Sequence, residues 1–158
     1  MAHLIDPLSD AYLQEFAQYF ATLDLPYSAP QPVTVSGDVL RAGEKLARKG
    51  DESRKIPACV QCHGDGLTGV MPATPGLIGM PRSYLSAQLG AWKTKLRRAH
   101  APDCMAQVAE RLSDADITAV SAWLAAQRVP NDSKSVQPGK APPPLDCGTA
   151  PKSVKVKP

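Results

Sequence analysis

The residues whose types and spacing could carry chemistry are Cys59, Cys62 and His63, in the pentapeptide CVQCH. Two intervening residues separate the cysteines by about one helical turn, so both thiols can lie along one edge of a flat ligand. Thiols at this spacing add to the two vinyl groups of a haem, and the adjacent imidazole then reaches the iron. The motif therefore predicts one covalently bound haem c with His63 as the proximal iron ligand.

Two other uses of a C-x-x-C pair agree less well with the sequence. A structural zinc site needs a second pair of ligands, and the chain has no other C-x-x-C and no H-x-x-H. A thioredoxin-like redox pair belongs to a parallel-sheet context, and no segment alternates apolar and polar residues as a half-buried strand does. Haem attachment is therefore the interpretation that the motif favours.

Amphipathic helices are the elements that must position this motif. Apolar residues recur at helical spacing in three segments, which are residues 38–49, 83–98 and 113–127. The last segment begins with Ser113 as a candidate N-cap and has Asp116 three residues later, a variant of the capping box. The glycine- and proline-rich residues between the first two helices, 64–82, are expected to be loop. These patterns predict an all-α chain.

Composition and charge exclude several classes of protein. The chain has 158 residues, of which 43% are hydrophobic and 21% charged, as in soluble globular proteins. Only 5% are aromatic, so an apolar cofactor would help to fill a thin core. A net charge of +3 without a basic run interleaved with aromatics argues against a nucleic-acid partner. No apolar segment is long enough to span a bilayer, so any association with a membrane complex is expected through protein partners.

Three further motifs follow the cysteines in order: HGDGLTG, PGLIGMPRSYLSAQLGAW, and a methionine that begins M-A-x-x-A-x-x-L-S-D-x-D-I. Over about residues 36–128 the chain resembles class I c-type cytochromes, especially the short bacterial type and the tandem two-haem type. The resemblance implies a class I cytochrome c fold around one covalently attached haem. In this chain the fold would carry an extra N-terminal helix and an extended proline-rich C-terminal tail.

The resemblance also implies the identity of the second axial ligand. In the family this ligand is a methionine shortly before the last helix, which maps onto Met105. A thioether ligand of this kind raises the reduction potential of the iron. Three residues remain as alternatives: Met71 and Met80 in the loop, and His100, whose imidazole would give bis-histidine ligation and a lower potential.

Other family positions map onto residues around the expected haem. The backbone carbonyl of Pro75 would accept the proton on the far ring nitrogen of His63 and so fix the ring. Gly43 would let the first helix of the domain cross the last one closely, opposite Trp123. The candidate donors to the haem propionates are Tyr84, Gln88 and Trp92. A basic group that would either be solvated, neutralise a propionate or meet an acidic partner comprises Lys93, Lys95, Arg97 and Arg98.

Two cysteines remain outside the haem motif, Cys104 and Cys147. Cys104 directly precedes Met105, and the family does not generally require a cysteine there. A disulfide between the two would draw the tail over the Met105 side of the haem. The alternative is two free thiols, which an oxidising compartment disfavours.

An internal repeat relates residues 1–21 to residues 105–125 at a constant offset of 104. The initial Met-Ala, the Leu-Ser-Asp-Ala cap sequence and the final Ala coincide, and amphipathicity alone does not demand a methionine in step with the cap. By this repeat, Met1 occupies the place of the axial methionine in a preceding haem domain. The expected parts of the chain are the last helix of that missing domain (1–24), a linker (25–35), a haem c domain (36–129) and a proline-rich tail (130–158).

We expect a periplasmic electron-transfer domain rather than an enzyme. The first residues lack the basic start and apolar run of an export signal, and haem c is attached after export, so both observations fit a chain truncated at its N-terminus. The expected partners are a redox donor and acceptor, such as a dehydrogenase, oxidase or reductase. One alternative is a cytochrome subunit docked to a dehydrogenase through the proline-rich tail. Another is a haem domain whose methionine swings away and leaves the iron open to peroxide or gases.

Overall fold

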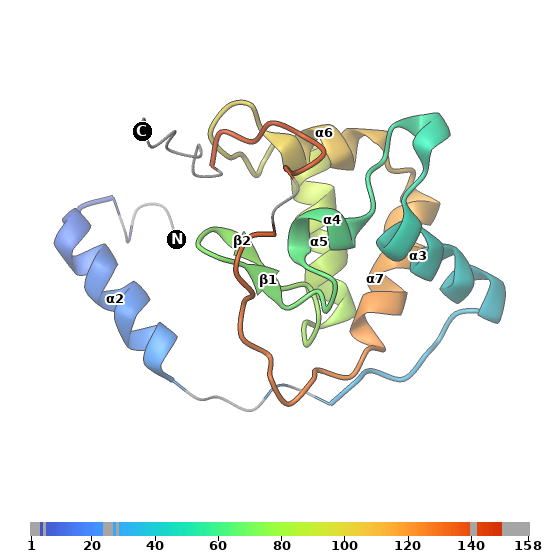
Figure 1. The fold of residues 1–158 in the computed structure, drawn as a ribbon, viewed down its shortest axis with the longest axis horizontal. Helices are drawn as coiled ribbons and strands as arrows, with labels where there is room; N and C mark the ends of the chain where they lie inside the picture. Colours follow the sequence, from blue (N-terminus) through green and yellow to red (C-terminus); the bar gives the residue numbers. More distant parts are fainter. Residues whose placement is uncertain (1–3, 5, 24–26, 28, 140–141, 150–158) are drawn as a thin grey trace.

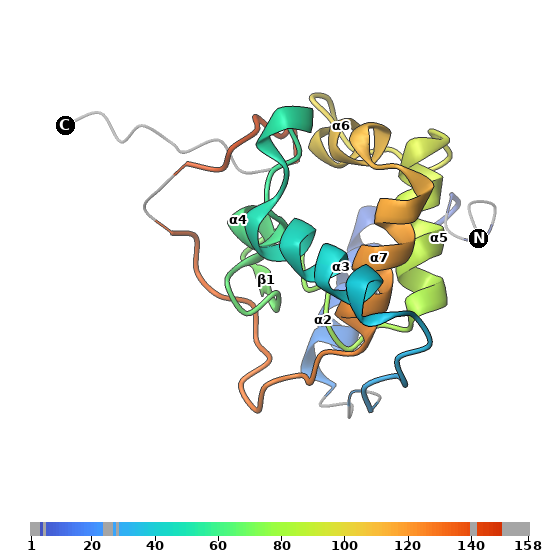
Figure 2. The same ribbon diagram turned by 90° about the vertical axis from the view of Figure 1, so that its right-hand side faces the viewer.

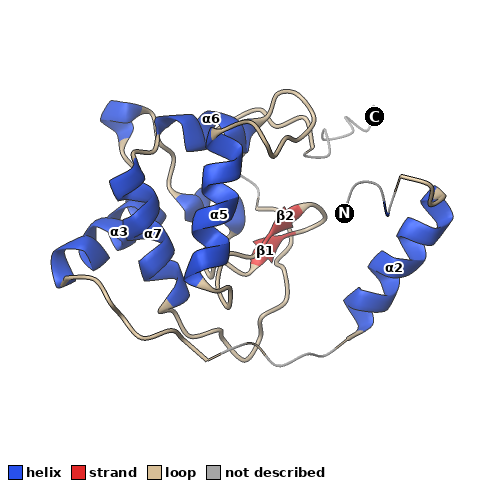
Figure 3. Cartoon of the chain, turned by 180° about the vertical axis from the view of Figure 1, so that it is seen from behind, coloured by secondary structure: helices blue, strands red, loops and turns tan. Residues whose placement is uncertain are grey.

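The computed structural model describes residues 4, 6–23, 27, 29–139 and 142–149, which form helices and one small hairpin (Figure 1; Figure 3). The helices are α2 (Asp10–Thr22), α3 (Gly37–Lys49), the 3-10 helix η1 (Glu52–Arg54), α4 (Cys59–His63), α5 (Arg82–Lys93), α6 (Cys104–Arg111) and α7 (Asp114–Ala125). Strands β1 (Gly69–Val70) and β2 (Thr74–Pro75) pair antiparallel inside the segment expected to be loop. The predicted all-α class is confirmed, with this hairpin as a local exception.

The core of the molecule lies where α7 packs against both α3 and α5 (Figure 2). Because α7 meets neighbours on two sides, it is apolar almost all round and is buried from Ile117 to Ala125 except at Thr118. At the crossing with α3, a Cβ on Gly43 would lie 3.0 Å from the Trp123 Cβ and would overlap the Ala119 carbonyl. Only glycine allows the two helices to approach this closely, which confirms the predicted role of Gly43.

The helix boundaries follow local signals in the sequence. Ser113 and Asp116 form the predicted capping box, with the Asp116 N–H donating to Ser113 Oγ at 3.1 Å and the Ser113 N–H donating to Asp116 Oδ2 at 2.8 Å. Helix α5 ends at Lys93, five residues before the predicted end. Lys95 adopts a left-handed φ of 62°, and Leu96 is 86% exposed, so residues 94–98 have no apolar face to bury as helix.

Helix α2 stands apart from the other helices in Figure 1 and Figure 3. It is a regular helix with Ser9 as N-cap, yet none of its residues is buried. The segment after it lies along the ends of α7 and α5, where the Gln31 N–H donates to the Ala125 carbonyl at 2.9 Å and the Arg82 N–H to Gln31 Oε1 at 2.9 Å. Gln31 and Thr34 therefore hold this segment against α5 and α7, whereas no residue of α2 is buried by the described parts of the chain.

The described residues of the C-terminal tail, 130–139 and 142–149, are attached to the rest of the chain at two places. Val136 pairs with Val70 in a parallel bridge, with the Met71 N–H donating to the Val136 carbonyl at 2.8 Å. Farther along, Cys147 forms a disulfide with Cys104, with their Cα atoms 5.2 Å apart, within the normal range. Figures 1 and 2 both show the described parts of the tail passing α4 and β1 and reaching the start of α6. Among the described residues, no helix is both long and apolar enough to cross a bilayer.

Candidate haem-binding site

The CVQCH pentapeptide forms α4, a single turn of helix between an extended residue and a glycine. Gln61 Oε1 accepts a hydrogen bond from the Ala58 N–H at 2.9 Å, which closes the first turn. Gly64 then leaves the helix with a φ of 83°, a conformation that favours glycine. The turn that the cysteine spacing predicted is therefore present, and it is fixed at both ends by local chemistry.

Cys59 and Cys62 are both free thiols and both half-buried. Burial raises the pKa of Cys59 to about 11, and burial also raises the pKa of Cys62. Both groups are therefore neutral S–H groups at pH 7, and they do not bond to each other. Two unpaired thiols one helical turn apart are the donor pair that thioether attachment to a haem requires.

His63 is the only buried histidine among the described residues, with 6% of its surface exposed. Its Nδ1 lies 2.7 Å from the Pro75 carbonyl oxygen, an acceptor without a proton, so Nδ1–H is the donor. Burial lowers the pKa of His63, and the bond to Pro75 opposes this shift only in part, so the ring is neutral at pH 7. Nε2 then keeps its lone pair free for a metal. The predicted contact between Pro75 and His63 is confirmed.

The hairpin explains how Pro75 reaches the histidine, although the two residues are twelve positions apart. Gly69 of β1 pairs with Pro75 of β2, and a Cβ on Gly69 would lie 2.7 Å from the Thr74 carbonyl oxygen. Gly69 also has a φ of 98°. A glycine is therefore required for the turn that returns Pro75 to α4, and this turn was not visible as a strand pattern.

Met105 lies in the first turn of α6 and is half-buried. The turn before it is fixed by Asp103, whose Oδ1 accepts from the Ala106 N–H at 3.0 Å and whose Oδ2 accepts from the Ala99 N–H at 2.7 Å. Both Figure 1 and Figure 2 show α6 above α4. Met105 as the second axial ligand stays a prediction, and its position in a fixed turn is consistent with it.

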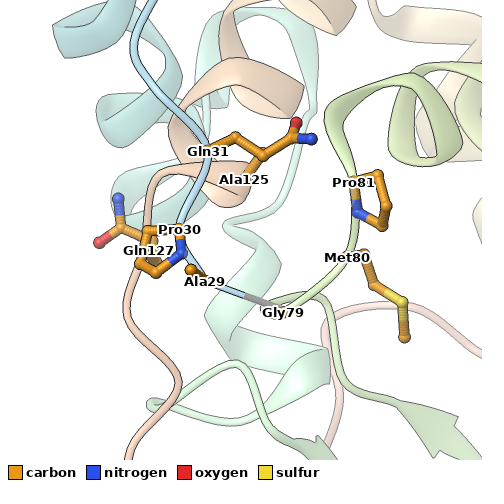
Figure 4. Close-up of a pocket in the computed structure, with 8 residues that line it drawn as sticks. All are labelled: Ala29, Pro30, Gln31, Gly79, Met80, Pro81, Ala125 and Gln127. Carbon is orange, nitrogen blue, oxygen red and sulfur yellow. The ribbon is translucent and has the colours of Figure 1, made fainter. Parts of the chain in front are cut away.

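The three alternatives to Met105 lie in more exposed places. Met71 is in the turn of the hairpin and is 46% exposed, and His100 is exposed in the loop before α6. Met80 is 36% exposed and borders a cavity of about 70 Å³ at the linker (Figure 4). The other residues that line this cavity are Ala29, Pro30, Gln31, Gly79, Pro81, Ala125 and Gln127. The surroundings of Met80 therefore include the linker and the end of α7.

Two of the three predicted propionate donors are joined by Arg97, which the sequence named only as one of four basic residues. The Arg97 guanidinium donates to Gln88 Oε1, and it lies 4.9 Å from the centre of the Trp92 ring. Arg97 returns to this place because its N–H donates to the Ala91 carbonyl at 3.0 Å after α5 has ended. Tyr84 is outside this cluster and is exposed. Arg97 differs from its basic neighbours because α5 ends at Lys93 and the chain then turns back, and this early end could not be seen in the sequence.

The residues present fit a covalently bound haem c. The one-turn helix offers two neutral thiols, and the neighbouring imidazole has its Nδ1 proton engaged and its Nε2 free. Met105 offers a soft thioether of the kind that binds haem iron. No group of three or more His, Cys, Asp or Glu side chains within the described ranges could hold a separate metal ion. The donor set is thus that of a haem and not of a zinc site.

Comparison with known proteins gives the same family from sequence and from fold. The family model described as cytochrome c matches residues 41–127. A thiosulfate dehydrogenase electron acceptor from Thiomonas intermedia is 40% identical over 127 residues, which cover 80% of this chain and 58% of that protein. The chain therefore spans little more than half the length of this relative.

Two solved structures share the fold. A thiosulfate dehydrogenase from Marichromatium purpuratum is 35% identical with a TM-score of 0.66, over 77% of this chain and 26% of that one. Cytochrome c4 from Acidithiobacillus ferrooxidans is 26% identical with a TM-score of 0.64, over 80% of this chain and 70% of that one. In both comparisons the matched segment covers more than three quarters of this chain.

Proposed function

The chain belongs to the cytochrome c family, and on that basis we propose that residues 36–129 form a periplasmic electron-transfer domain with one haem c. Cys59 and Cys62 would hold the haem through two thioether bonds, and His63 and Met105 would ligate its iron. The observation that carries the proposal is the buried His63 ring, fixed by Pro75, directly after two unpaired thiols. When bound, the haem supplies an iron that gains and loses one electron.

The side chains of this domain hold the redox centre without rearranging. Pro75 keeps the His63 ring in one orientation and makes its Nε2 a better donor. Because protein side chains would ligate the iron in both oxidation states, little reorganisation would oppose electron transfer. A thioether ligand from Met105 would raise the reduction potential of the iron.

The cluster around Arg97 is suited to the haem propionates. Arg97 is a permanent cation, and Gln88 and the ring of Trp92 hold its guanidinium in place. We assign Trp92, Gln88 and Arg97 to this role, together with Tyr84 as a solvent-side donor. Neutralising a propionate in this way stabilises the carboxylate and reduces the negative potential near the iron.

Residues 1–24 are assigned to the last helix of a preceding cytochrome domain, and residues 25–35 to the linker. Three observations support this assignment: the repeat at offset 104, the serine cap of both helices, and the exposed apolar face of α2. Residues 1–3, Met1 included, lie outside the described residues. On this proposal Met1 corresponds to the axial methionine of the earlier domain, and residues 130–158 are the tail.

The names of the similar proteins point to a dehydrogenase as the electron donor. An electron acceptor of thiosulfate dehydrogenase is 40% identical to this chain, and a solved thiosulfate dehydrogenase contains a segment of the same fold. A dehydrogenase-docked cytochrome is therefore the second form of the proposal, with an enzyme that oxidises a reduced sulfur compound as the first donor to test.

Haem attachment is tested by expressing the chain behind an export signal in a bacterium that matures c-type cytochromes. We expect a Soret band that survives acid–acetone extraction, and a near-infrared sulfur-to-iron charge-transfer band in the ferric protein. Cys59→Ser combined with Cys62→Ser is the control, because it removes both thioether bonds and leaves His63 in place. Pigment that extracts from the unmodified chain as freely as from the control would refute covalent attachment.

Electron transfer is tested by mixing the ferric protein with a thiosulfate dehydrogenase and its substrate and following reduction of the haem. Rapid reduction in the presence of substrate, and none without it, is the expected result. Carbon monoxide separates the remaining alternative, because a displaceable methionine would let the reduced iron bind the gas fully and quickly. Such binding would contradict a purely electron-carrying role.

A further inference from the structure

The two attachments of the tail fall beside the two proposed axial ligands. The strap is defined here as residues 130–139 and 142–149. At one end Val136 lies against Gly64, the residue after His63, because a Cβ on Gly64 would be 3.3 Å from Val136 Cγ2. At the other end Cys147 is bonded to Cys104, the residue before Met105. The strap therefore connects the segment of one ligand to the segment of the other.

Each end of the strap is seated by backbone contacts. Near α4, the Val136 N–H donates to the Gly69 carbonyl at 3.0 Å and Met71 donates back to Val136 at 2.8 Å. Near α6, the Gly148 N–H donates to the Pro102 carbonyl at 2.9 Å. A Cβ on Gly148 would be 2.6 Å from the His100 carbonyl oxygen and would overlap the Ala101 carbonyl. Only glycine can sit this close to the loop that leads into Met105.

Helix α6 packs along α5, with Val108 beside a core cluster, but its first turn, which carries Met105, has no buried residue. It is eight residues long and buries only Ala109, whereas the next helix, α7, buries most of its residues. Short helices are marginal without tertiary contacts. The first turn of α6 is instead fixed by Asp103 and by the Cys104–Cys147 bond, whose ends are 43 residues apart in sequence. The Cys104–Cys147 bond is thus one of the contacts that fix the Met105 backbone, and it is the one that the strap supplies.

We propose that the strap is a positioning device for the distal ligand, which ties the start of α6 to the α4–β1 side and keeps the Met105 thioether at the iron. This inference rests on the proposed His63 and Met105 ligation. Its contribution to function is selective: a loosened strap leaves the haem attached through Cys59 and Cys62 and still ligated by His63. What changes is the lifetime of the sulfur–iron bond. Cys147, Gly148 and Val136 are therefore positioning residues that act through Met105.

The test compares two variants that release the same end of the strap by different means. Cys104→Ser combined with Cys147→Ser removes the covalent bond. Gly148→Val keeps both cysteines but introduces a side chain that collides with the His100 and Ala101 carbonyls, so the backbone of residue 148 can no longer pack there. Lys134→Ala, at an exposed strap residue, is the matched control. Each protein is prepared with its haem attached, and the near-infrared charge-transfer band, the reduction potential and carbon monoxide binding are measured.

Both releasing variants are expected to weaken the charge-transfer band and to lower the reduction potential. Carbon monoxide should bind their reduced form at least about tenfold faster, which corresponds to roughly 1.4 kcal/mol in the barrier. Haem content and far-ultraviolet circular dichroism should stay those of the unmodified chain, as should every property of Lys134→Ala. If the disulfide only stabilised the fold, its removal would lower the unfolding midpoint and leave the charge-transfer band and carbon monoxide binding unchanged.

The outcomes separate this inference from the function it rests on. If the unmodified chain has the band and both variants keep it and resist carbon monoxide, the strap proposal is overturned and the ligation stands. If the unmodified chain has covalent haem but no band, Met105 is not the ligand and both fall. Should a variant fail to fold, the native protein is treated with a dithiol, its two released thiols are alkylated, and the reoxidised haem is measured in the same way.

Discussion

Helices α2 and α7 have nearly the same pattern of residues and opposite surroundings. At the constant offset of 104, Phe20 of α2 corresponds to Leu124 of α7, yet Phe20 is 64% exposed and Leu124 is 2% exposed. Both helices are capped by a serine that accepts a backbone N–H three residues on. An amphipathic sequence therefore determines the helix and its apolar face, whereas burial of that face depends on a second element that packs against it. For α7 that partner is α3 and α5; for α2 no described element covers the face.

We expect the largest difference between the two helices when Leu124 and its counterpart Phe20 are each shortened to alanine and the free energy of unfolding is compared. Leu124→Ala should lower the free energy of unfolding by about 2–5 kcal/mol, because it opens a cavity in the core. Phe20→Ala should change it by roughly 0.5 kcal/mol or less, because the side chain loses no buried contact. Denaturant unfolding of the haem-loaded proteins, followed by circular dichroism, measures both values. Equal losses would mean that α2 packs in solution as α7 does, and the contrast between them would disappear.

A second, smaller effect concerns the caps. Ser113→Ala should cost about 1 kcal/mol, because the Ser113 hydroxyl makes two hydrogen bonds to Asp116 and α7 is part of the cooperative core. Ser9→Ala should leave global unfolding unchanged and only fray the first turn of α2. The α2 cap lacks a reciprocal partner, since Tyr12 stands where α7 has Asp116. The same unfolding measurement applies, with amide hydrogen exchange in α2 as the local readout. A global loss in Ser9→Ala would show that α2 unfolds together with the core.

The sequence predicts the features that depend on local patterns better than those that depend on tertiary contacts. Local signals in the sequence predicted the turn of α4 and the helix α7 with its capping box. The resemblance to the family predicted the contact of Pro75 with His63. The Cys104–Cys147 pair, left open against two free thiols, is a disulfide in the structure. The two helices depend on residues close in sequence, and the Pro75 contact depends on a family motif. The disulfide joins residues 43 positions apart, and the sequence offered it only as one of two uses of the remaining cysteines.

The features that could not be predicted depend on contacts between distant residues. The end of α5 at Lys93 is set by a left-handed Lys95 that has no sequence signature. The position of Arg97 on Trp92 follows from that turn, so its separation from the other basic residues was not visible. The β1–β2 hairpin is two residues long per strand, too short for an alternating pattern, and the tail joins it through Val136. Periodicity cannot report pairings of this kind.

The smallest predicted effect concerns the long-range ion pair at the start of α7, which has no counterpart at α2 among the residues that the structure describes. Arg54 binds Asp116 at the start of α7, with Nη1 2.6 Å from Oδ2, and Arg54 also binds Asp51 with Nε 2.7 Å from Oδ2. Hydrogen bonds from Ser53 and then Arg54 lower the pKa of Asp51 to about 2. Partial burial raises the pKa of Asp116, but the hydrogen bonds from Arg54 and Ser113 outweigh it, so that pKa is also lowered.

The sign of the pH dependence follows from these lowered values. A carboxylate with a folded pKa below its unfolded pKa of about 3.9 stabilises the fold fully above that value, and the contribution is lost as pH falls toward the folded pKa. Arg54→Gln should therefore lower the thermal midpoint at pH 6 slightly, and its difference from the unmodified chain should shrink between about pH 4 and pH 2. Thermal unfolding of both proteins from pH 6 to pH 2 gives the comparison. A difference that stayed constant to pH 2 would mean that Arg54 acts through packing and not through its carboxylate partners, and the capping box would then be the contrast that remains between the start of α7 and that of α2.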